Sequence, residues 1–457
     1  MTSVFAPADY NGDNGATITG SYAVSDAVQL LPSVVVATHA VGRSVGVVGL
    51  GYVGLPTALA LADSGSTVVA YDVSPQRLTM IAAGAVDLLQ SDHVRLSRCT
   101  ASGRFRLTDD PASLALTDTI IVCVPTPVDE HLVPDVAALS AACTMVVGQA
   151  VRGQTIVLTS TSYVGCTRDL LVHPLCARGW RVGEDIFVAF SPERIDPGNT
   201  VHLQEDTPRM VGGATPACRE RAVTALRRTT RHVQELSSPE AAELTKLLEN
   251  SFRAVNIALA NEFADVAHEL GLDVMEVINA AATKPYGFMP FYPGPGVGGH
   301  CIPCDPHYLL WQLRARRAHS PVMEAAMTAI AGRPRRVIAR VREVLGEVGR
   351  PVAGAKILVV GVTYKPGVAD LRESPALEVI AELWRAGADV SYVDPYVASL
   401  PMGERELAGV TDPETIPWDL VVVHTVHPNV DHGWIANVPT VLDASYRMAG
   451  VPHRALL

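Results

Sequence analysis

The order of hydrophobic and polar positions predicts alternating strands and helices over the first half of the chain. After Arg43, the segment "VGVVGLGYVGLPTALALADSGSTVVAYDVSP" contains an apolar strand, a glycine-rich turn, a helix of small residues and a second apolar strand that ends at Asp72. This order is typical of a βαβ unit. Three further apolar runs, "DTIIVCVPTP", "GQTIVLTST" and "DIFVAFSPE", follow at intervals long enough for crossover helices. We therefore predict a parallel, doubly wound sheet.

A long helix is predicted in the middle of the chain, between Ser238 and Gly271. Ser238 is suited to cap this helix, Pro239 suits its first position, and Gly271 can end it. At 1.5 Å per residue the helix would be about 48 Å long, which is enough to join two domains. Further helices are predicted in "LDVMEVINAAAT" and after Asp305.

The pattern of strand, helix and strand returns from Lys356, and "WDLVVVHTV" and "PTVLDAS" predict two more strands. The predicted fold class is α/β, with two Rossmann-like doubly wound lobes bridged by a long central helix. Four domains are predicted: an N-terminal extension at 1–42, a nucleotide-binding Rossmann domain at 43–236, a central helical domain with a cysteine-containing loop at 237–335, and a second Rossmann-like domain at 336–457.

Composition and charge narrow the class of protein. Of the 457 residues 48% are hydrophobic, yet no run approaches the roughly 18 apolar residues that a membrane-spanning helix needs. The first 42 residues place no lysine or arginine ahead of an apolar core, so we expect a loosely ordered extension and no secretory signal. The eight cysteines are scattered, which favours reduced thiols and a cytoplasmic protein. A net charge of −11 disfavours nucleic-acid binding, so anionic ligands would need local clusters of lysine and arginine.

The glycine-rich turn has the spacing of a dinucleotide-binding fingerprint, Gly49-x-Gly51-x-x-Gly54. A strand precedes it, a helix follows it and Asp72 ends the next strand, which is the context that the fingerprint requires. Asp72 would accept hydrogen bonds from ribose hydroxyls and repel a 2′-phosphate, which favours NAD over NADP, although Arg77 lies near enough to weaken this preference. The alternative is that these glycines serve only turn geometry and packing.

The segment "GPGVGGHCIPCDPHYL" contains Cys301-x-x-Cys304, with His300 and His307 on either side. This pattern is compatible with a redox dithiol, a zinc site or a single nucleophile. A redox pair usually opens a helix, whereas prolines lie inside and just after this motif. A structural zinc site would need a second ligand pair, and the chain has no other C-x-x-C and no H-x-x-x-H. No metal is therefore predicted.

The glycines before the cysteines favour a loop whose backbone closely approaches a ligand. Cys301 would then be a nucleophile, provided that neighbouring groups increase its thiolate fraction, and Cys304 is expected to be an inert buried thiol. On the predicted long helix, Lys246, Asn250 and Arg253 lie on one face together with Asn261. Because apolar residues cover much of the rest of the helix, we expect this polar stripe to be buried, where a lysine and an amide one turn apart can hold an oxyanion.

Several long motifs in one order make the chain resemble the nucleoside-diphosphate-sugar 6-dehydrogenases, the family of UDP-glucose and UDP-N-acetylhexosamine dehydrogenases. These motifs include Gly49 to Pro56, "CVPTP", "SPERIDPGN", Lys246-x-x-x-Asn250, "GPGVGGHCIPCDP" and "GVTYKPGVADLRESP". The resemblance extends from about Ser44 to the C-terminus. It implies a first lobe for NAD, a second lobe for the nucleotide sugar, and a long helix that builds a homodimer.

By this resemblance the enzyme oxidises the primary alcohol of the sugar to a carboxylate, with two NAD and Cys301 as nucleophile. The first hydride transfer leaves an aldehyde, Cys301 adds to it, the thiohemiacetal gives up a second hydride, and water cleaves the thioester. The resemblance further implies that Lys246 and Asn250 stabilise the oxyanion and that Asp305 is the acid near the cysteine. It also implies Glu193 as the base for thioester hydrolysis and Thr161 as the residue that positions water.

The resemblance also implies binding residues. The cofactor site would include Tyr52, Val53 and Thr126 beside the glycines, Asp72 and Arg77, with Arg372 at the pyrophosphate. Lys284, Tyr292 and Gly298 would contact the substrate, and Lys365 its phosphate. These cations would give an acidic protein its local sites for anions.

Two segments depart from the family pattern. Cys304 occupies a position where many relatives have lysine, and "TSTSYVGCT" differs from the usual E-S-T-x-x-P-G-T-T at Thr159, Val164 and Cys166. "GPGVGGHCIP" and "SPERIDPGN" resemble the acetamido-sugar branch, but UDP-glucose, dTDP-glucose and UDP-N-acetylhexosamines all stay open as substrates. Two alternatives remain: a thiol-redox or zinc-binding regulatory protein on a dinucleotide-binding fold, and a non-catalytic sugar-nucleotide binder.

Overall fold

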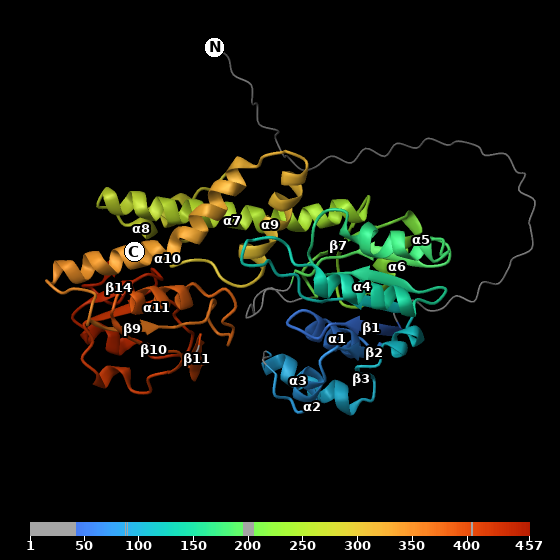
Figure 1. Cartoon of the computed structure of the whole chain (residues 1–457), viewed down its shortest axis with the longest axis horizontal. Coiled ribbons are helices and arrows are strands. Elements are labelled where there is room, and N and C mark those ends of the chain that lie inside the picture. Colours follow the sequence, from blue (N-terminus) through green and yellow to red (C-terminus); the bar gives the residue numbers. More distant parts are fainter. Residues whose placement is uncertain (1–42, 87, 89, 195–204, 404) are drawn as a thin grey trace, which may run out of the picture. The chain divides into compact units, whose positions relative to one another are not determined.

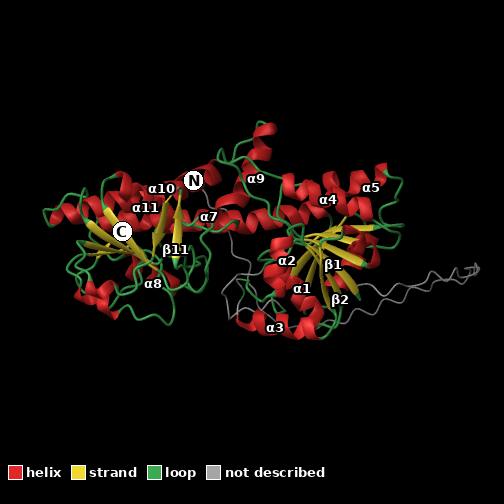
Figure 2. Ribbon diagram, turned by 60° about the horizontal axis from the view of Figure 1, so that its bottom comes forward, coloured by secondary structure: helices red, strands yellow, loops and turns green. Residues whose placement is uncertain are grey.

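A computed structural model describes residues 43–457 except 87, 89, 195–204 and 404. The predicted extension at 1–42 and the end of the "SPERIDPGN" motif lie outside the described residues. Within the described part, the strands form two separate multi-stranded parallel or mostly parallel sheets and one two-stranded hairpin (Figure 2). No helix in this part is long and apolar enough to cross a membrane.

The first sheet has the strand order that is typical of dinucleotide-binding folds, with the order reversing between the first and fourth strands. Within the described residues its strands follow the order β3-β2-β1-β4-β5-β6-β7-β8. They are β1 (Ser44–Val48), β2 (Thr67–Tyr71), β3 (Phe105–Thr108), β4 (Thr119–Val122), β5 (Thr155–Leu158), β6 (Phe187–Phe190), β7 (Arg209–Gly213) and β8 (Val233–Leu236). The five strands predicted in this half are confirmed as β1, β2, β4, β5 and β6.

The sheet departs from the predicted all-parallel arrangement at one edge. β7 pairs with β6 in the antiparallel sense, and β8 then runs parallel to β7. An antiparallel edge on an otherwise parallel sheet is common in doubly wound folds. Neither β7 nor β8 was predicted, and β3 was also missed, because the short segments "RMVGG", "VQEL" and "FRLT" lack a long apolar run.

Helices cover both faces of this sheet because its strands bury both of their faces. Val45 and Val47 point into a core shared with α1 (Gly54–Asp63) and α6 (Pro216–Leu226), and α3 also packs on α1. Val48 points into the opposite core, which α4 lines. The remaining helices of this lobe are α2 (Pro75–Ala82), α3 (Gln90–Ala101), α4 (Ala137–Gln149) and α5 (His173–Ala177).

The central region is helical, as predicted (Figure 1). Its long helix, α7, spans Pro239–Glu269, and the hydroxyl of Ser238 accepts a hydrogen bond from the Ala241 amide at 3.2 Å, which confirms the predicted N-cap. Gly271 follows the helix with φ +67°, a backbone conformation that glycine adopts without strain. α7 packs against three further helices, chiefly α9 (Cys301–Ala315) and α10 (Pro321–Glu347). The other central helices are α8 (Val274–Ala282), α9 (Cys301–Ala315) and α10 (Pro321–Glu347).

The start of α9 corrects the sequence interpretation. The helix begins at Cys301 itself and not after Asp305, so the cysteine motif does open a helix. Pro303 falls among the first four residues, whose amides have no partner inside the helix, so a missing N–H is tolerated there. Pro306 lies further inside, where it leaves one helical hydrogen bond unmade. The prolines are therefore no evidence against a redox C-x-x-C at this position.

The polar stripe on α7 is buried only in part. Asn250 and Asn261 are buried, Lys246 is partly buried, and Arg253 is exposed. The prediction was therefore right for the two amides and wrong for Arg253. The apolar residues that were expected to lie around the stripe are largely exposed instead: Leu248, Phe252 and Leu259 are each 46–64% accessible. Small residues such as Ala254 and Ala258 fill the packed side of the helix.

The second lobe is a smaller parallel sheet in the order β10-β9-β13-β14-β15. α10 and α11 (Pro375–Arg385) share a core with one face of this sheet. The strands are β9 (Lys356–Val360), β10 (Asp389–Val393), β13 (Leu420–Val423), β14 (Val441–Asp443) and β15 (Ala455–Leu456), and a separate hairpin consists of β11 (Ser399–Met402) and β12 (Arg405–Ala408). The four strands predicted after Lys356 are confirmed, whereas β11, β12 and β15 were missed.

Candidate active site

The three glycines of the turn between β1 and α1 serve different purposes: two are required by packing and one leaves room for a ligand. Gly49 has φ +87°, and a Cβ there would lie 2.6 Å from the carbonyl oxygen of Cys123. A Cβ on Gly54 would lie 1.8 Å from the carbonyl oxygen of Gly49. Chain packing explains these two glycines. A Cβ on Gly51 would meet no atom within 4 Å, so this glycine leaves open space beside the helix N-terminus, where the fingerprint places a pyrophosphate. The turn therefore fits a dinucleotide.

Asp72 and Arg77 fix the shape of this turn. The Asp72 carboxylate accepts hydrogen bonds from the Leu50 amide at 2.8 Å and from the Ser74 amide at 2.9 Å. Arg77 Nε donates to the Leu50 carbonyl oxygen at 3.0 Å. The Nε atom of Arg77 is therefore already hydrogen-bonded to the backbone of the fingerprint turn. Val53 precedes α1 and packs against the core.

Arg372 joins three parts of the candidate site. Its guanidinium lies 4.1 Å from the centre of the Tyr52 ring, and its Nη2 pairs with Asp370 at 2.6 Å. The carbonyl oxygen of Arg372 accepts a hydrogen bond from the Gly299 amide at 2.9 Å. A residue of the second lobe thereby contacts both the fingerprint turn and the loop before the cysteine. Thr126, in "CVPTP", interacts through its side chain with the Tyr308 hydroxyl of α9.

Three of the glycines before the cysteine, Gly296, Gly298 and Gly299, lie against protein atoms rather than open space. A Cβ on Gly298 would lie 2.5 Å from Tyr364 Cβ, and one on Gly299 would lie 2.9 Å from the Tyr364 ring. A Cβ on Gly296 would lie 2.6 Å from Pro375. These glycines let the loop pack against the second lobe, which is a different reason from the ligand approach inferred from the sequence. Contact of Gly298 with substrate stays a prediction.

Cys301 is exposed at the first residue of α9. Three further residues predicted to be catalytic, Lys246, Asn250 and Asp305, lie near it. Nearby protein atoms and the Asp305 carboxylate raise the pKa of the Cys301 thiol, while Lys246, Arg253 and Arg372 oppose this shift. Asp305 is buried and accepts a hydrogen bond from the Asn250 amide. Its burial raises the pKa of this carboxyl to about 6, against the influence of Lys246 and Asn250.

Glu193 is held beside this group by an arginine that the sequence analysis missed. Lys246 Nζ donates a hydrogen bond to the carbonyl oxygen of Glu193 at 3.0 Å. The Glu193 carboxylate pairs with Arg209 Nη1 at 2.9 Å and accepts from the Arg194 amide at 2.9 Å. Arg209 is almost completely buried in β7. An arginine at the start of an apolar strand was the available signal, because a buried cation requires an anionic partner.

The loop with Thr161 follows β5 and is clamped at its far end. The Glu243 carboxylate of α7 accepts hydrogen bonds from the Gly165 amide at 2.6 Å and the Thr167 amide at 2.9 Å. Val164 stands where the family pattern described above has proline, and its amide donates to Gln312 of α9 at 3.1 Å. The amide that this departure introduces therefore has a partner in the same chain. Neither Glu243 nor Gln312 was recognised from the sequence.

Lys284 and Tyr292 lie on an exposed segment between α8 and α9. The Lys284 ammonium is 5.2 Å from the centre of the Tyr286 ring, and the Tyr292 hydroxyl donates to Asn279 at 3.3 Å. No described contact joins either residue to Cys301. Lys365 lies in the loop after β9, where the Thr363 hydroxyl donates to its carbonyl oxygen at 3.0 Å.

Cys304 differs from Cys301 in accessibility. Its side chain is buried one turn into α9, and its sulfur lies 3.8 Å from His300 Nδ1. Burial, together with the charge of Asp305, raises the pKa of the Cys304 thiol to about 12. Among the described residues, no group of three or more His, Cys, Asp or Glu side chains has the arrangement of a metal site.

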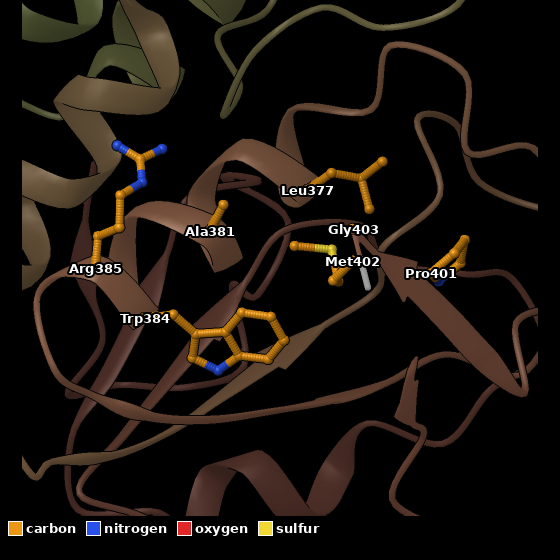
Figure 3. A pocket seen from close by; sticks show the side chains of 7 residues that line it. All are labelled: Leu377, Ala381, Trp384, Arg385, Pro401, Met402 and Gly403. Atoms are coloured by element: carbon orange, nitrogen blue, oxygen red, sulfur yellow. The ribbon is translucent and has the colours of Figure 1, made fainter. Parts of the chain in front are cut away.

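A pocket of about 540 Å³ opens elsewhere, beside α11 and β11 (Figure 3). Its lining includes Trp384 and Met402, with the Arg385 side chain at the edge. None of the predicted site residues is among the described residues that line it. The chemistry implied by the sequence therefore belongs to the cysteine loop and not to this pocket.

Comparison with known proteins identifies the family of the chain. Residues 43–230 match the NAD binding domain, 240–329 the central domain and 358–447 the UDP binding domain of the UDP-glucose/GDP-mannose dehydrogenase family. The chain belongs to this family. It is therefore an NAD-dependent nucleotide-sugar dehydrogenase, an oxidoreductase that acts on CH–OH groups of sugars. The resemblance stated from the motifs is confirmed, as are NAD as the cofactor and the fold with two Rossmann-like lobes.

Relatives of this dehydrogenase cover most of its length. It is 34% identical to UDP-N-acetyl-D-glucosamine 6-dehydrogenase of Pseudomonas aeruginosa over 388 residues, 84% of this chain and 90% of the relative. It is 33% identical to UDP-N-acetyl-D-mannosamine dehydrogenase of Pyrococcus horikoshii over 391 residues, 84% of this chain and 89% of the relative.

Solved structures agree with this assignment. The structure of UDP-D-ManNAc dehydrogenase from Pyrococcus horikoshii matches with a TM-score of 0.79 at 31% identity, covering 88% of this chain and 95% of that one. A UDP-glucose dehydrogenase from Pyrobaculum islandicum matches with a TM-score of 0.80 at 25% identity, covering 94% and 98% respectively. The fold of the family is thus present over nearly the whole described chain.

Proposed function

We propose that this dehydrogenase oxidises the primary alcohol of a nucleoside-diphosphate hexose to a carboxylate through a thiohemiacetal and a thioester on Cys301. The observation that carries the proposal is the exposed Cys301 thiol at the start of α9, with Asp305, Asn250 and Lys246 beside it. NAD, held at the fingerprint turn, supplies a hydride acceptor. All other steps fall to residues of the chain.

Formation of the thiolate is the first requirement, and the site contains both opposing and favourable groups. Desolvation by nearby protein atoms and the charge of Asp305 raise the pKa of the Cys301 thiol, although Cys301 is exposed. Three cations oppose this shift, and the thiol also lies at the N-terminal end of α9, where the free amides and the helix dipole favour a negative charge. We infer that the exposed Cys301 thiol releases its proton to solvent and that the thiolate then adds to the aldehyde carbon, which moves the negative charge from sulfur to the carbonyl oxygen.

Lys246 and Asn250 are proposed to stabilise the oxyanion that develops as Cys301 adds to the aldehyde. They lie one turn apart on α7, and each is already held by a hydrogen bond, Lys246 to the Glu193 carbonyl oxygen and Asn250 to Asp305. Donors fixed in this way need little reorganisation during the reaction, which is the usual source of such stabilisation. Glu193 is proposed to take a proton from the water that cleaves the thioester, with Thr161 positioning this water.

The substrate class is proposed to be a UDP-N-acetylhexosamine. The names of several relatives, which are dehydrogenases of N-acetylated UDP sugars, support this choice, as does the motif "GPGVGGHCIP". Lys365 is proposed to bind the substrate phosphate, and Lys284, Tyr292 and Gly298 to contact the substrate. UDP-glucose and dTDP-glucose are the competing substrates in a panel assay of NADH formation.

A homodimer is proposed through the outer face of α7. This face is apolar and accessible. Because monomeric proteins rarely expose large contiguous apolar patches, such a face marks an interaction surface. Its residues include Leu248, Phe252, Leu259, Phe263 and Val266. A second copy of the same helix would bury this face by an isologous contact.

Two serine substitutions test the nucleophile against the thiol-redox alternative. Cys301→Ser should abolish turnover, because a hydroxyl at this position cannot form the thioester. Cys304→Ser should retain most activity, since its thiol is buried and has a pKa of about 12. Initial NADH rates of both variants with the best substrate of the panel provide the measurement. Equal losses in the two variants would favour a function that needs both thiols.

A further inference from the structure

The second lobe repeats the turn geometry of the first lobe without its glycine fingerprint. Gly361, after β9, has φ +77°, and a Cβ there would lie 2.0 Å from the carbonyl oxygen of Thr425, as Gly49 approaches Cys123 in the first lobe. Asp394, after β10, accepts a hydrogen bond from the Val362 amide at 2.7 Å. Asp72 accepts from the first-lobe turn in the same way. The two lobes thus place an acid against the same kind of turn.

The environment of this acid differs between the lobes. Asp72 is partly exposed and lies directly after the carboxyl end of β2. The side chain of Asp394 is fully buried, and His427, from the loop after β13, pairs with it at 3.0 Å while being 1% exposed itself. The Tyr396 ring also covers His427, with 4.8 Å between ring centres. Asp394 is therefore closed to any ligand and cannot bind a ribose as proposed for Asp72.

The hydrogen bonds of His427 reach the loop that contains Lys365. The Gly367 amide donates to His427 Nδ1 at 3.1 Å, so this nitrogen is unprotonated and Nε2 donates to Asp394. The Thr363 hydroxyl lies 3.3 Å from Nε2 and donates to the Lys365 carbonyl oxygen at 3.0 Å. The backbone on both sides of Lys365 is therefore tied to one buried pair.

We propose that Asp394 and His427 are positioning residues, which hold the loop 363–367 so that Lys365 meets the diphosphate of the nucleotide sugar. This inference rests on the proposed role of Lys365. A buried carboxylate is costly unless it is paired and hydrogen-bonded. In the second lobe, Asp394 is buried away from any ligand and pairs with His427. His427 in turn accepts a hydrogen bond from the loop that contains Lys365.

UDP binding to the full-length protein, measured by calorimetry, tests this inference. His427→Ala should weaken UDP binding about tenfold, the effect of losing one hydrogen-bonded anchor of a charged contact, and leave NAD binding unchanged. His427→Gln should recover most of the affinity, because its amide can donate to Asp394. Lys365→Met should weaken UDP binding at least as much. His453→Ala is the matched control, since this histidine of the same lobe bonds only the Val438 carbonyl oxygen among described contacts, and it should bind UDP normally.

Hydrogen exchange keeps the test informative if His427→Ala folds poorly. Asp394→Asn removes the carboxylate with little change of shape and should speed exchange of the Gly367 amide while exchange in the first lobe stays as in the wild type. Unchanged UDP affinity in His427→Ala, or equal losses of UDP and NAD binding, would overturn the inference. So would UDP loss in His427→Ala together with normal binding in Lys365→Met. Normal UDP binding in Lys365→Met alone refutes the proposed role of Lys365.

Discussion

Asp305 is a buried carboxyl group. The free-energy cost of burying it depends on pH, because the ionised form is disfavoured there. Burial raises its pKa from 3.8 to about 6. Between these values the native protein retains a proton that the unfolded chain releases. The stabilising contribution of the neutral acid is therefore fully present below pH 3.8 and is lost as the pH rises through about 6.

This shift predicts a pH-dependent difference between the wild type and Asp305→Asn. At about 1.4 kcal/mol per pKa unit, ionisation of Asp305 should lower the free energy of unfolding by roughly 2 kcal/mol between pH 4 and pH 7. Asparagine does not ionise, so the variant should lack this slope. Denaturant unfolding at a series of pH values measures it, and parallel pH profiles of the two proteins would contradict the assignment.

Single residues also show which parts of the site the sequence could predict. Cys301, Lys246 and Asn250 stand in motifs of fixed spacing, so the sequence suffices to propose them as site residues. Arg209 and His427 lie far along the chain from their partners Glu193 and Asp394. The position of Arg209 at the start of an apolar strand indicates a buried cation, but neither residue carries a local signal for its partner, because each pairing depends on the folded sheet.

At the scale of elements, local rules predicted the strands with long apolar runs and both ends of α7, but not the short strands or the surroundings of each element. The caps of α7 followed from Ser238, Pro239 and Gly271. Which face of α7 is buried did not follow, because small residues pack closely against α9 and α10 while larger apolar residues are left outside. The start of α9 was missed because both prolines were treated as helix breakers, although the helix needs no amide at Pro303 and tolerates the one hydrogen bond that Pro306 leaves unmade.

The loop before α9 supplies a prediction with a matched control. In Gly298→Ala the new Cβ would lie 2.5 Å from Tyr364 Cβ and 2.7 Å from the Glu373 carbonyl oxygen, so the loop or the second lobe must shift. We expect a loss of about 1–3 kcal/mol in stability and a marked loss of activity. Gly294→Ala places its Cβ where no atom lies within 4 Å and should behave as the wild type. Melting temperatures and NADH rates of both variants decide this, and similar behaviour would contradict the packing explanation.

At the scale of the whole molecule, the apolar face of α7 predicts self-association. Phe263→Glu introduces a charge within this face, where Phe263 is exposed, and should convert a dimer to a monomer, as measured by light scattering after size exclusion. Leu116→Glu is the control, because Leu116 is 75% exposed but lies in the first lobe, away from α7 in sequence and element. A wild-type protein that elutes with the mass of one chain would refute the proposed dimer.

The central claim concerns the number of electrons that one sugar gives up. A simple alcohol dehydrogenase stops at the aldehyde, whereas a cysteine that captures the aldehyde permits a second oxidation before release. The direct measurement is the number of NADH molecules formed per nucleotide sugar consumed when the reaction runs to completion with limiting sugar. The proposed role of Cys301 predicts two NADH per sugar and a carboxylate product. One NADH per sugar, with an aldehyde or ketone as the final product, would contradict it.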